Sequence, residues 1–469
     1  MNPPGRPKGE YRSAQHEGLA SPPPGRPKGE HRSAQHEGLA NSPPGRVNEE
    51  HAPITTGQGL SYGALGLPLA FVALPLYVIL PNHYATSFGM PLATLGLILL
   101  GARLFDAFID PVIGRWCDRL FAHSPGRVLA MGALAAVVLA AGFGLLFFPA
   151  TRDPVGLAAW AGGFLVLTYA AYSALSVAHQ SWGAMLGGDE ARRSRIVAWR
   201  EGLALLGVVL ASVAPTLLGL PLTWVLFCAC LAIGWMAWTR AMRPRTRPSA
   251  QATDLWLPLR RPDFRRLLGV FVLNGIASAI PATLVLFFVQ DRLLAPRSME
   301  PAFLGTYFVC AAASMPLWLT LVGRIGLART WMCGMVLAVA AFVWAATLGS
   351  GDTVAFLLVC AASGIALGTD LALPGAMLAG LIGQAGHRGS AEGAYFGWWN
   401  FATKLNLALA AGLALPLLAL FGYTPGARDA SALGALTIAY CLLPCVLKLG
   451  AAALLYRHQH QWTVKGEPA

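Results

Sequence analysis

Charged residues are scarce in this chain of 469 residues: only 12% are Asp, Glu, Lys or Arg, whereas 55% are hydrophobic. About a quarter of the residues of an ordinary soluble domain are charged, so this composition excludes that class. Histidine and cysteine are also few, with ten and eight copies. None of them stands in a nucleophile or metal-ligand pattern, which argues against an enzyme, a bound metal or another cofactor. A membrane-embedded enzyme is kept only as a remote alternative.

Long apolar runs are abundant instead. Runs of about 20 apolar residues are typical of membrane-spanning helices, and twelve are found, at 59–81, 91–111, 127–149, 155–180, 197–219, 221–240, 265–290, 301–323, 328–349, 353–382, 395–421 and 431–456. The fold class predicted is an all-α membrane protein with twelve transmembrane helices.

The formal net charge of +12 does not indicate a nucleic-acid partner, because the basic residues follow the loops. They gather after the second, fourth and sixth spans, at Arg115, Arg119, Arg192, Arg193, Arg195, Arg240, Arg243, Arg245, Arg247, Arg260, Arg261, Arg265 and Arg266. Every second loop is basic, which is the positive-inside pattern. We therefore expect a multi-pass protein of the inner (plasma) membrane, surrounded by lipid, with both termini in the cytoplasm.

Composition divides the chain into five parts. The segment at 4–20 recurs almost unchanged at 24–40, and this Pro-, Gly- and charge-rich stretch is predicted to be disordered. The predicted parts are a tail over 1–52, a six-helix bundle over 53–240, a basic cytoplasmic linker over 241–263, a second six-helix bundle over 264–457 and a cytoplasmic tail over 458–469. Two such bundles are the plan of transporters that bind a small-molecule substrate between the halves, and a monomer is the expected state.

The second span contains charges in an unusual arrangement. Arg103, Asp106 and Asp110 are spaced i, i+3 and i+7, so they share one helix face. Two carboxylates one turn apart repel in a medium of low dielectric constant unless a cation or proton joins them. Arg103 supplies part of that positive charge, and a sodium ion or a proton would supply the rest. The structural alternative is an internal ion pair that fixes helix packing.

The stretch from Arg103 to Arg119 reads R-x-x-D-x-x-x-D-P-x-x-G-x-x-x-D-R. It resembles the second-helix signature of the glycoside–pentoside–hexuronide:cation symporters, the branch of the major facilitator superfamily that contains the melibiose permease. The stretches at 187–202 and 389–423 are similar to the fourth loop and the eleventh helix of that family. The resemblance covers about 53–457 and implies the major facilitator fold.

The resemblance also implies roles for individual residues. Asp106 and Asp110, with the hydroxyl of Ser173, would bind the coupling cation. Lys404 would couple the cation to the substrate, and Arg200 would contact the substrate. Asp118 and Arg119 match a superfamily motif that latches the second helix to the rest of the N-terminal half.

Other candidates come from the residues themselves. Asp370 is an additional buried acid. It is predicted to replace the acids that galactoside-binding relatives carry in their first and fourth helices and that this chain lacks, or to pair with Lys404. Tyr172 and Ser176 lie beside Ser173, and Trp399 and Asn400 belong to an aromatic cluster that suits a sugar ring, so all four are candidate substrate residues. Structural alternatives stay open for these residues. Lys404 would be a lysine that snorkels to the membrane surface, and Arg200 and Trp399 would be interfacial residues. Asp370 would lie next to a loop, and Asp118 would be a solvated loop residue.

The sequence thus predicts a cation-coupled symporter for a small polar solute, a sugar or sugar acid, working by alternating access. The stretches 63–71 and 172–180 lack the acids of galactoside-binding relatives, so another solute is expected. A lipid or lysolipid transporter of the same fold is the alternative. A proton is favoured over sodium, because Ile109 stands where sodium-using relatives have an Asn oxygen; no metal is expected beyond a transported sodium ion.

Overall fold

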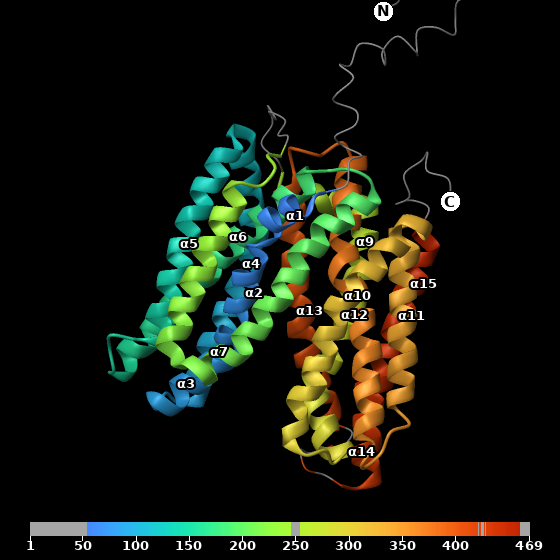
Figure 1. Cartoon of the computed structure of the whole chain (residues 1–469). Coiled ribbons are helices and arrows are strands. Elements are labelled where there is room, and N and C mark those ends of the chain that lie inside the picture. Colours follow the sequence, from blue (N-terminus) through green and yellow to red (C-terminus); the bar gives the residue numbers. More distant parts are fainter. Residues whose placement is uncertain (1–53, 245–253, 421, 424–425, 427, 460–469) are drawn as a thin grey trace, which may run out of the picture. The chain divides into compact units, whose positions relative to one another are not determined.

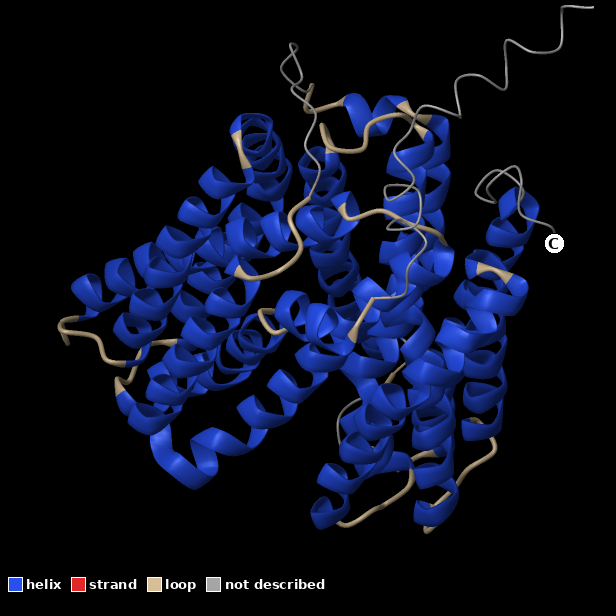
Figure 2. Ribbon diagram, turned by 45° about the horizontal axis from the view of Figure 1, so that its top comes forward, coloured by secondary structure: helices blue, strands red, loops and turns tan. Residues whose placement is uncertain are grey.

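The structure is a computed structural model and describes residues 54–244, 254–420, 422–423, 426 and 428–459. The tail predicted over 1–52, the middle of the linker predicted over 241–263 and nearly all of the tail predicted over 458–469 lie outside the described residues. Figure 2 shows helices joined by loops, with no strand in the part of the chain that the structure describes.

The first half consists of six long helical segments (Figure 1). The first segment is built from four consecutive elements, and the last two are arms of one kinked helix. The elements are α1 (Thr56–Gly63), α2 (Gly66–Leu74), η1 (Pro75–Ile79), α3 (Leu80–Ser87), α4 (Leu92–His123), α5 (Pro125–Phe147), α6 (Pro154–Met185) and α7 (Glu190–Thr239).

The second half repeats this plan. A short helix, α8, precedes six further segments, and the first and last of these contain a π-helical turn. The elements are α8 (Leu257–Arg260), α9 (Pro262–Phe287), η2 (Phe288–Arg292), η3 (Arg297–Met299), α10 (Glu300–Ile325), α11 (Leu327–Ala345), α12 (Thr353–Gln384), α13 (Glu392–Leu420), α14 (Ala430–Thr437), η4 (Ile438–Leu442) and α15 (Leu443–His458).

Local sequence explains where several helices begin and break. Ser124 and Asp153 accept hydrogen bonds from backbone N–H groups in the first turns of α5 and α6, which are N-cap positions. The Thr151 hydroxyl and the Gly156 N–H hold the pKa of Asp153 below its usual range. Gly219 breaks α7 with φ 74°, a conformation that glycine adopts without a Cβ clash. The predicted boundary between the fifth and sixth spans falls at this residue.

Nine helical stretches of the described chain are long and apolar enough to cross a membrane, and α7 is one of them although Gly219 divides it. Helices α4 and α13, with 32 and 29 residues, are also long enough. Counting both arms of α7, the described residues contain the twelve predicted spans, so the predicted all-α fold is confirmed.

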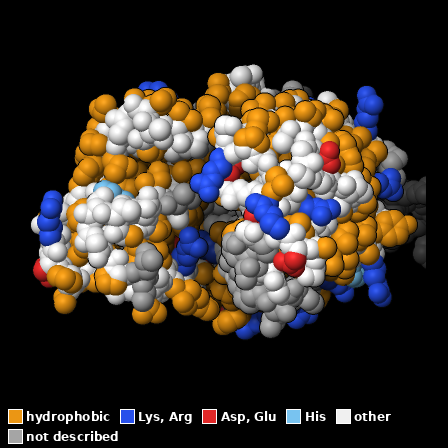
Figure 3. Space-filling model, turned by 90° about the horizontal axis from the view of Figure 1, so that it is seen from below, with side chains coloured by type: hydrophobic (Ala, Val, Ile, Leu, Met, Phe, Trp, Pro, Cys, Tyr) orange, Lys and Arg blue, Asp and Glu red, His pale blue; other side chains and the backbone are white. Residues whose placement is uncertain are grey.

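Each half is a bundle, and the two bundles meet where α4, α6 and α7 pack against α10, α12 and α13. Helix α7 packs on α2 in the first half, α12 packs on α10 and α11 in the second, and α4 packs on α13 between the halves. We call the end of the bundles where α1 begins and α15 ends the linker end, and the end with α3 and α14 the far end (Figure 1). Seen from the far end, the surface is hollowed between the two halves, with Lys and Arg side chains at the margin (Figure 3).

Candidate functional site

A four-residue cluster joins the two halves, with Asp106 and Asp110 from α4, Ser173 from α6 and Lys404 from α13. Lys404 Nζ lies 2.6 Å from Asp106 Oδ1 and 2.8 Å from Asp110 Oδ2. The same ammonium donates hydrogen bonds to Ser173 Oγ at 2.8 Å and to the Asp106 carbonyl at 3.2 Å. Ser173 Oγ in turn donates to Asp106 Oδ1 at 2.8 Å. The structure therefore brings together the residues predicted to bind and couple the cation.

The cluster is removed from water and holds an excess negative charge. Asp110 is 0% exposed, Asp106 2% and Ser173 1%, while the Lys404 side chain is 18% exposed. One ammonium faces two carboxylates, and Asp110 Oδ1 has no hydrogen-bond partner among the described residues. A buried oxygen without a donor is costly.

Glycines let α4 and α13 approach closely enough to form the cluster. A Cβ on Gly114 would lie 2.0 Å from the Gly393 carbonyl oxygen, and a Cβ on Gly397 would lie 2.6 Å from the Asp110 carbonyl oxygen. Small residues at such crossings are typical of helix packing in membranes. The backbone contact thus depends on glycine on both helices, one turn away from the carboxylates.

The sequence predicts that Arg103 supplies positive charge to the two carboxylates, but its side chain does not pair with them. Its side chain is exposed, and its guanidinium lies 4.7 Å from the centre of the Tyr77 ring, while no ion pair joins it to an acid among the described residues. Lys404 reaches both carboxylates from the facing helix, whereas the Arg103 guanidinium lies over the Tyr77 ring of the first segment.

Asp118 and Arg119 are predicted to latch α4 to the rest of the first half, but the partner of Asp118 lies in the second half. Asp118 Oδ1 accepts a hydrogen bond from the Gly393 N–H at 2.6 Å, and Oδ2 accepts one from the Ala394 N–H at 2.8 Å. These N–H groups lie in the first turn of α13, where they lack helical partners and attract a negative charge. Asp118 therefore ties α4 to the second half rather than to the first, and Arg119 is exposed.

A second carboxylate makes a similar link near the linker end. Glu190, the first residue of α7, accepts a hydrogen bond from the Leu327 N–H at 2.7 Å, and Leu327 begins α11. Asp118 and Glu190 together bind the starts of two helices of the second half. Glu190 could not be singled out from the sequence, because an acid at the start of a helix ordinarily serves its own helix.

Asp370 pairs with Lys448 of α15 and not with Lys404. Its carboxylate lies 2.9 Å from Lys448 Nζ and accepts hydrogen bonds from Asn274 Nδ2 at 3.0 Å, Ser278 Oγ at 3.2 Å and Trp331 Nε1 at 2.8 Å. All five residues belong to the second half. A lysine inside the apolar run at 431–456 is the signal that would have located this cluster, since intramembrane charges need a partner.

The residues predicted to contact the substrate from the first half lie near the cation cluster. Tyr172 is half-buried and within electrostatic range of Asp106 and Asp110. Ser176 accepts a hydrogen bond from Gln180 Nε2 at 2.8 Å. Arg200 forms an ion pair with its neighbour Glu201 and lines a small pocket of about 20 Å³ between the halves. These roles stay predictions.

Trp399 and Asn400 lie on α13 near its start. Trp399 is 6% exposed and stacks on Phe271 of α9 with 3.8 Å between ring centres, whereas Asn400 is half-buried. A stacked ring helps to hold α13 against α9, and its role toward a substrate stays a prediction.

In the part of the chain that the structure describes, no three His, Cys, Asp or Glu side chains come together as metal ligands.

These features define a class: a polytopic helical membrane protein whose two six-segment bundles are joined by buried ion pairs. A family comparison makes the class specific. Residues 61–459 match the family described as MFS/sugar transport protein, and the chain belongs to this family of the major facilitator superfamily. It is accordingly a transporter and not an enzyme.

Other proteins are similar to this chain in sequence or in fold. The chain is 27% identical over 282 residues to a protein of Deinococcus radiodurans described as "Putative sugar efflux transporter", a match that covers 55% of this chain and 67% of the relative. A bacterial homologue of the iron transporter ferroportin in its outward-facing state has a TM-score of 0.65 at 16% identity, covering 87% of this chain and all of the other. The Escherichia coli fucose:proton symporter FucP has a TM-score of 0.61 at 16% identity, with 84% and 98% covered.

Proposed function

We propose that this protein is a cation-coupled symporter of the melibiose-permease-like branch, and that it moves a small sugar or sugar acid across the inner membrane by alternating access. The observation that supports this most is the contact of Lys404 with Asp106 and Asp110 across the two halves. In transporters of this plan the substrate and coupling-ion sites lie at the interface between the two halves.

In this proposal Lys404 stands in for the cation when the transporter is empty. The cluster holds one formal negative charge in excess, so a cation that enters from the far end is attracted to Asp110. Once it is bound, the ammonium is no longer needed to compensate both carboxylates, and the contact between α4 and α13 weakens. Cation binding raises substrate affinity, and by linkage the substrate raises cation affinity by the same factor.

The coupling ion we favour is a proton. A sodium ion requires several oxygen ligands, and the side chain before Asp110 is that of Ile109, which has none. A proton requires only one carboxylate, and Asp110 Oδ1 is buried without a hydrogen-bond partner among the described residues. Burial and a carboxylate neighbour both favour a protonated acid. The similarity to FucP, a fucose:proton symporter, supports the fold on which such coupling occurs.

The basic loops orient the protein with its termini in the cytoplasm, so the linker end is the cytoplasmic end. In this scheme Asp118 and Glu190 close the cytoplasmic side, and the hollow at the far end faces outward. A downhill flow of protons into the cell drives uptake in this scheme. The same cycle run down a substrate gradient releases sugar, the direction named for the Deinococcus relative.

The substrate class is tested by transport with a defined panel. Purified protein in proteoliposomes is loaded with an unlabelled sugar, and counterflow of the same labelled sugar is measured for neutral hexoses, pentoses, disaccharides and hexuronates. At least one hexose, pentose or hexuronate is expected to show counterflow above protein-free liposomes. Counterflow of a lysolipid with none for any sugar or uronate would replace this substrate class by the lipid alternative.

A further inference from the structure

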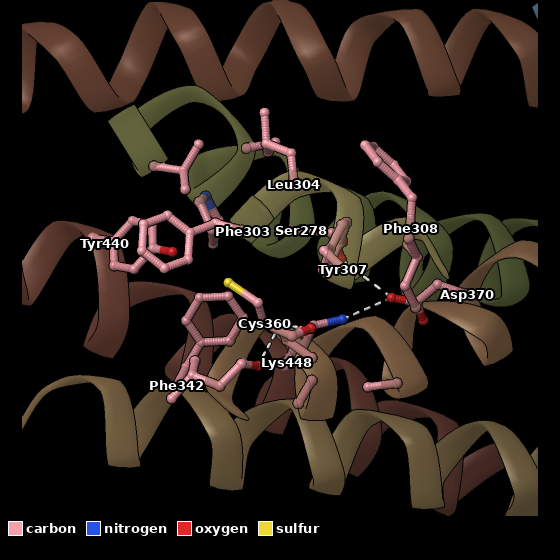
Figure 4. A pocket seen from close by; sticks show the side chains of 18 residues that line it. Ser278, Phe303, Leu304, Tyr307, Phe308, Phe342, Cys360, Asp370, Tyr440 and Lys448 are labelled. Carbon is pink, nitrogen blue, oxygen red and sulfur yellow. Dashed lines mark hydrogen bonds and ion pairs between the residues drawn. The ribbon is translucent and has the colours of Figure 1, made fainter. Parts of the chain in front are cut away.

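The second half contains a recess that the cation cluster does not use. It has a volume of about 320 Å³ and lies between α9, α10, α12, α11 and the last segment. Small-molecule pockets range from about 300 to 1,000 Å³ and are mostly apolar with a few polar groups. In Figure 4, Asp370 lies at one side of the recess and Tyr440 at the other.

The wall of the recess is rich in aromatic rings. Five aromatic side chains line it, namely Phe303, Tyr307, Phe308, Phe342 and Tyr440. Within the described residues, the hydroxyls of Tyr307 and Tyr440 have no hydrogen-bond partner. Aromatic walls favour contact with flat or ring-shaped molecules, and each free phenol hydroxyl can donate to or accept from a ligand oxygen.

The polar side of the recess carries no net formal charge. Asp370 receives four hydrogen-bonding contacts, from Lys448, Asn274, Ser278 and Trp331. Lys448 Nζ also donates to Asn274 Oδ1 at 2.8 Å and is 4% exposed. The carboxylate and the ammonium compensate one another, so a charged ligand would enter without a counter-charge and lose its hydration.

The recess has exposed residues of two helices at its rim. Leu304 of α10 is 40% exposed, and Ala282 of α9 is also exposed, while Ala338 and Ala366 at the back are buried. Small alanines at the back and an open rim leave room for an entering molecule without rearrangement of the bundle.

We propose that this recess binds an uncharged ring-containing molecule that bears a hydroxyl or carbonyl group, and that it does so independently of the Asp106–Asp110–Lys404 cluster. The ring packs against the aromatic wall, and the oxygen pairs with the hydroxyl of Tyr307 or Tyr440. The molecule arrives either from water or from the membrane.

The test uses 1-naphthol as the neutral probe, with the full-length protein in lipid nanodiscs and equilibrium dialysis against empty nanodiscs. Saturable binding of one 1-naphthol per chain is expected, with 1-naphthoate and 1-naphthylmethylammonium at least tenfold weaker. 1-Decanol, which has the hydroxyl but no ring, should also be at least tenfold weaker. Protein in detergent without lipid distinguishes the source, because a probe that arrives from water binds equally there.

Variants locate the site. Ala282→Trp should block the rim and weaken binding at least tenfold, whereas Ala302→Trp, at an exposed alanine of α10 outside the recess, should leave it unchanged. Leu304→Trp replaces the first variant if that one does not fold. Asp110→Asn should retain naphthol binding. Non-saturable binding, equal affinity of a charged analogue or of decanol, no effect of either rim variant, or loss of binding in Asp110→Asn would each overturn the proposal.

Discussion

At the scale of single residues, Lys404 compensates the charge of two buried carboxylates. Its ammonium contacts Asp106 and Asp110 at 2.6 and 2.8 Å, and both acids are nearly inaccessible to water. Removing one partner of a buried pair is far more damaging than the net stabilisation of the pair, because a charge is left without compensation.

Lys404→Met should therefore lower thermal stability strongly, by an amount on the order of 3 kcal/mol. The double variant Lys404→Met/Asp106→Asn should regain part of this loss, because one of the two stranded carboxylates is then neutral. Thermal unfolding in detergent measures both. Arg103→Gln is the matched control, since Arg103 makes no ion pair among the described residues. A Lys404→Met protein as stable as that control would show that the ion pair contributes little.

The sequence predicted which residues form the cluster but not all of the pairings between charges. Charged residues inside apolar runs are rare, so the sequence alone identified Asp106, Asp110 and Lys404 as candidates. Their pairing depends on which helices face one another, and that is set by packing between segments far apart in sequence. For the same reason Asp370 was linked to Lys404 although the structure pairs it with Lys448.

At the scale of elements, the crossing of α4 and α13 holds the linker end together. Gly114 and Gly397 permit backbone contact there, and Asp118 binds the first turn of α13. Helix positions followed from the length of apolar runs because the bilayer requires each spanning segment to satisfy its own hydrogen bonds. The π-helical turns η1, η2 and η4 were not predicted, since they have no comparable signal in hydropathy.

Gly114→Ala should push α4 and α13 apart, because its Cβ would lie 2.0 Å from the Gly393 carbonyl oxygen. Cys117, which is 0% exposed on the next turn of α4, should then react several-fold faster with a small alkylating reagent. Peptide mass spectrometry reads the modification at this one cysteine. Gly101→Ala on the same helix is the control, because a Cβ there meets nothing within 4 Å. Equal rates in the two variants would contradict the close crossing.

At the scale of the whole molecule, two bundles with separate ion-pair clusters form one transporter. The cluster around Lys404 joins the halves, whereas that around Lys448 lies within the second half. In the proposed cycle only the first would be broken as the halves separate, so only the first fits the proposed coupling. The parts at 1–52 and 458–469 remain predictions from sequence, apart from residues 458 and 459.

Deleting residues 2–52 should leave membrane insertion and transport rate unchanged, because a near-perfect repeat rich in Pro, Gly and charge cannot form a core. Expression in membranes and initial uptake rate are compared with the full chain. A truncated protein that inserts normally but no longer transports would give the tail a role in the cycle.

Proton coupling at Asp106 and Asp110 predicts uptake into proteoliposomes under an imposed pH gradient without sodium. The full-length protein should accumulate the sugar found by counterflow, and a sodium gradient alone should give no accumulation. Asp106→Asn and Asp110→Asn should each abolish accumulation while folding normally, and Asp352→Asn, in an exposed loop, should accumulate like the unaltered protein. Accumulation that requires sodium and ignores the pH gradient, or normal accumulation by both variants, would exclude proton coupling at these two carboxylates.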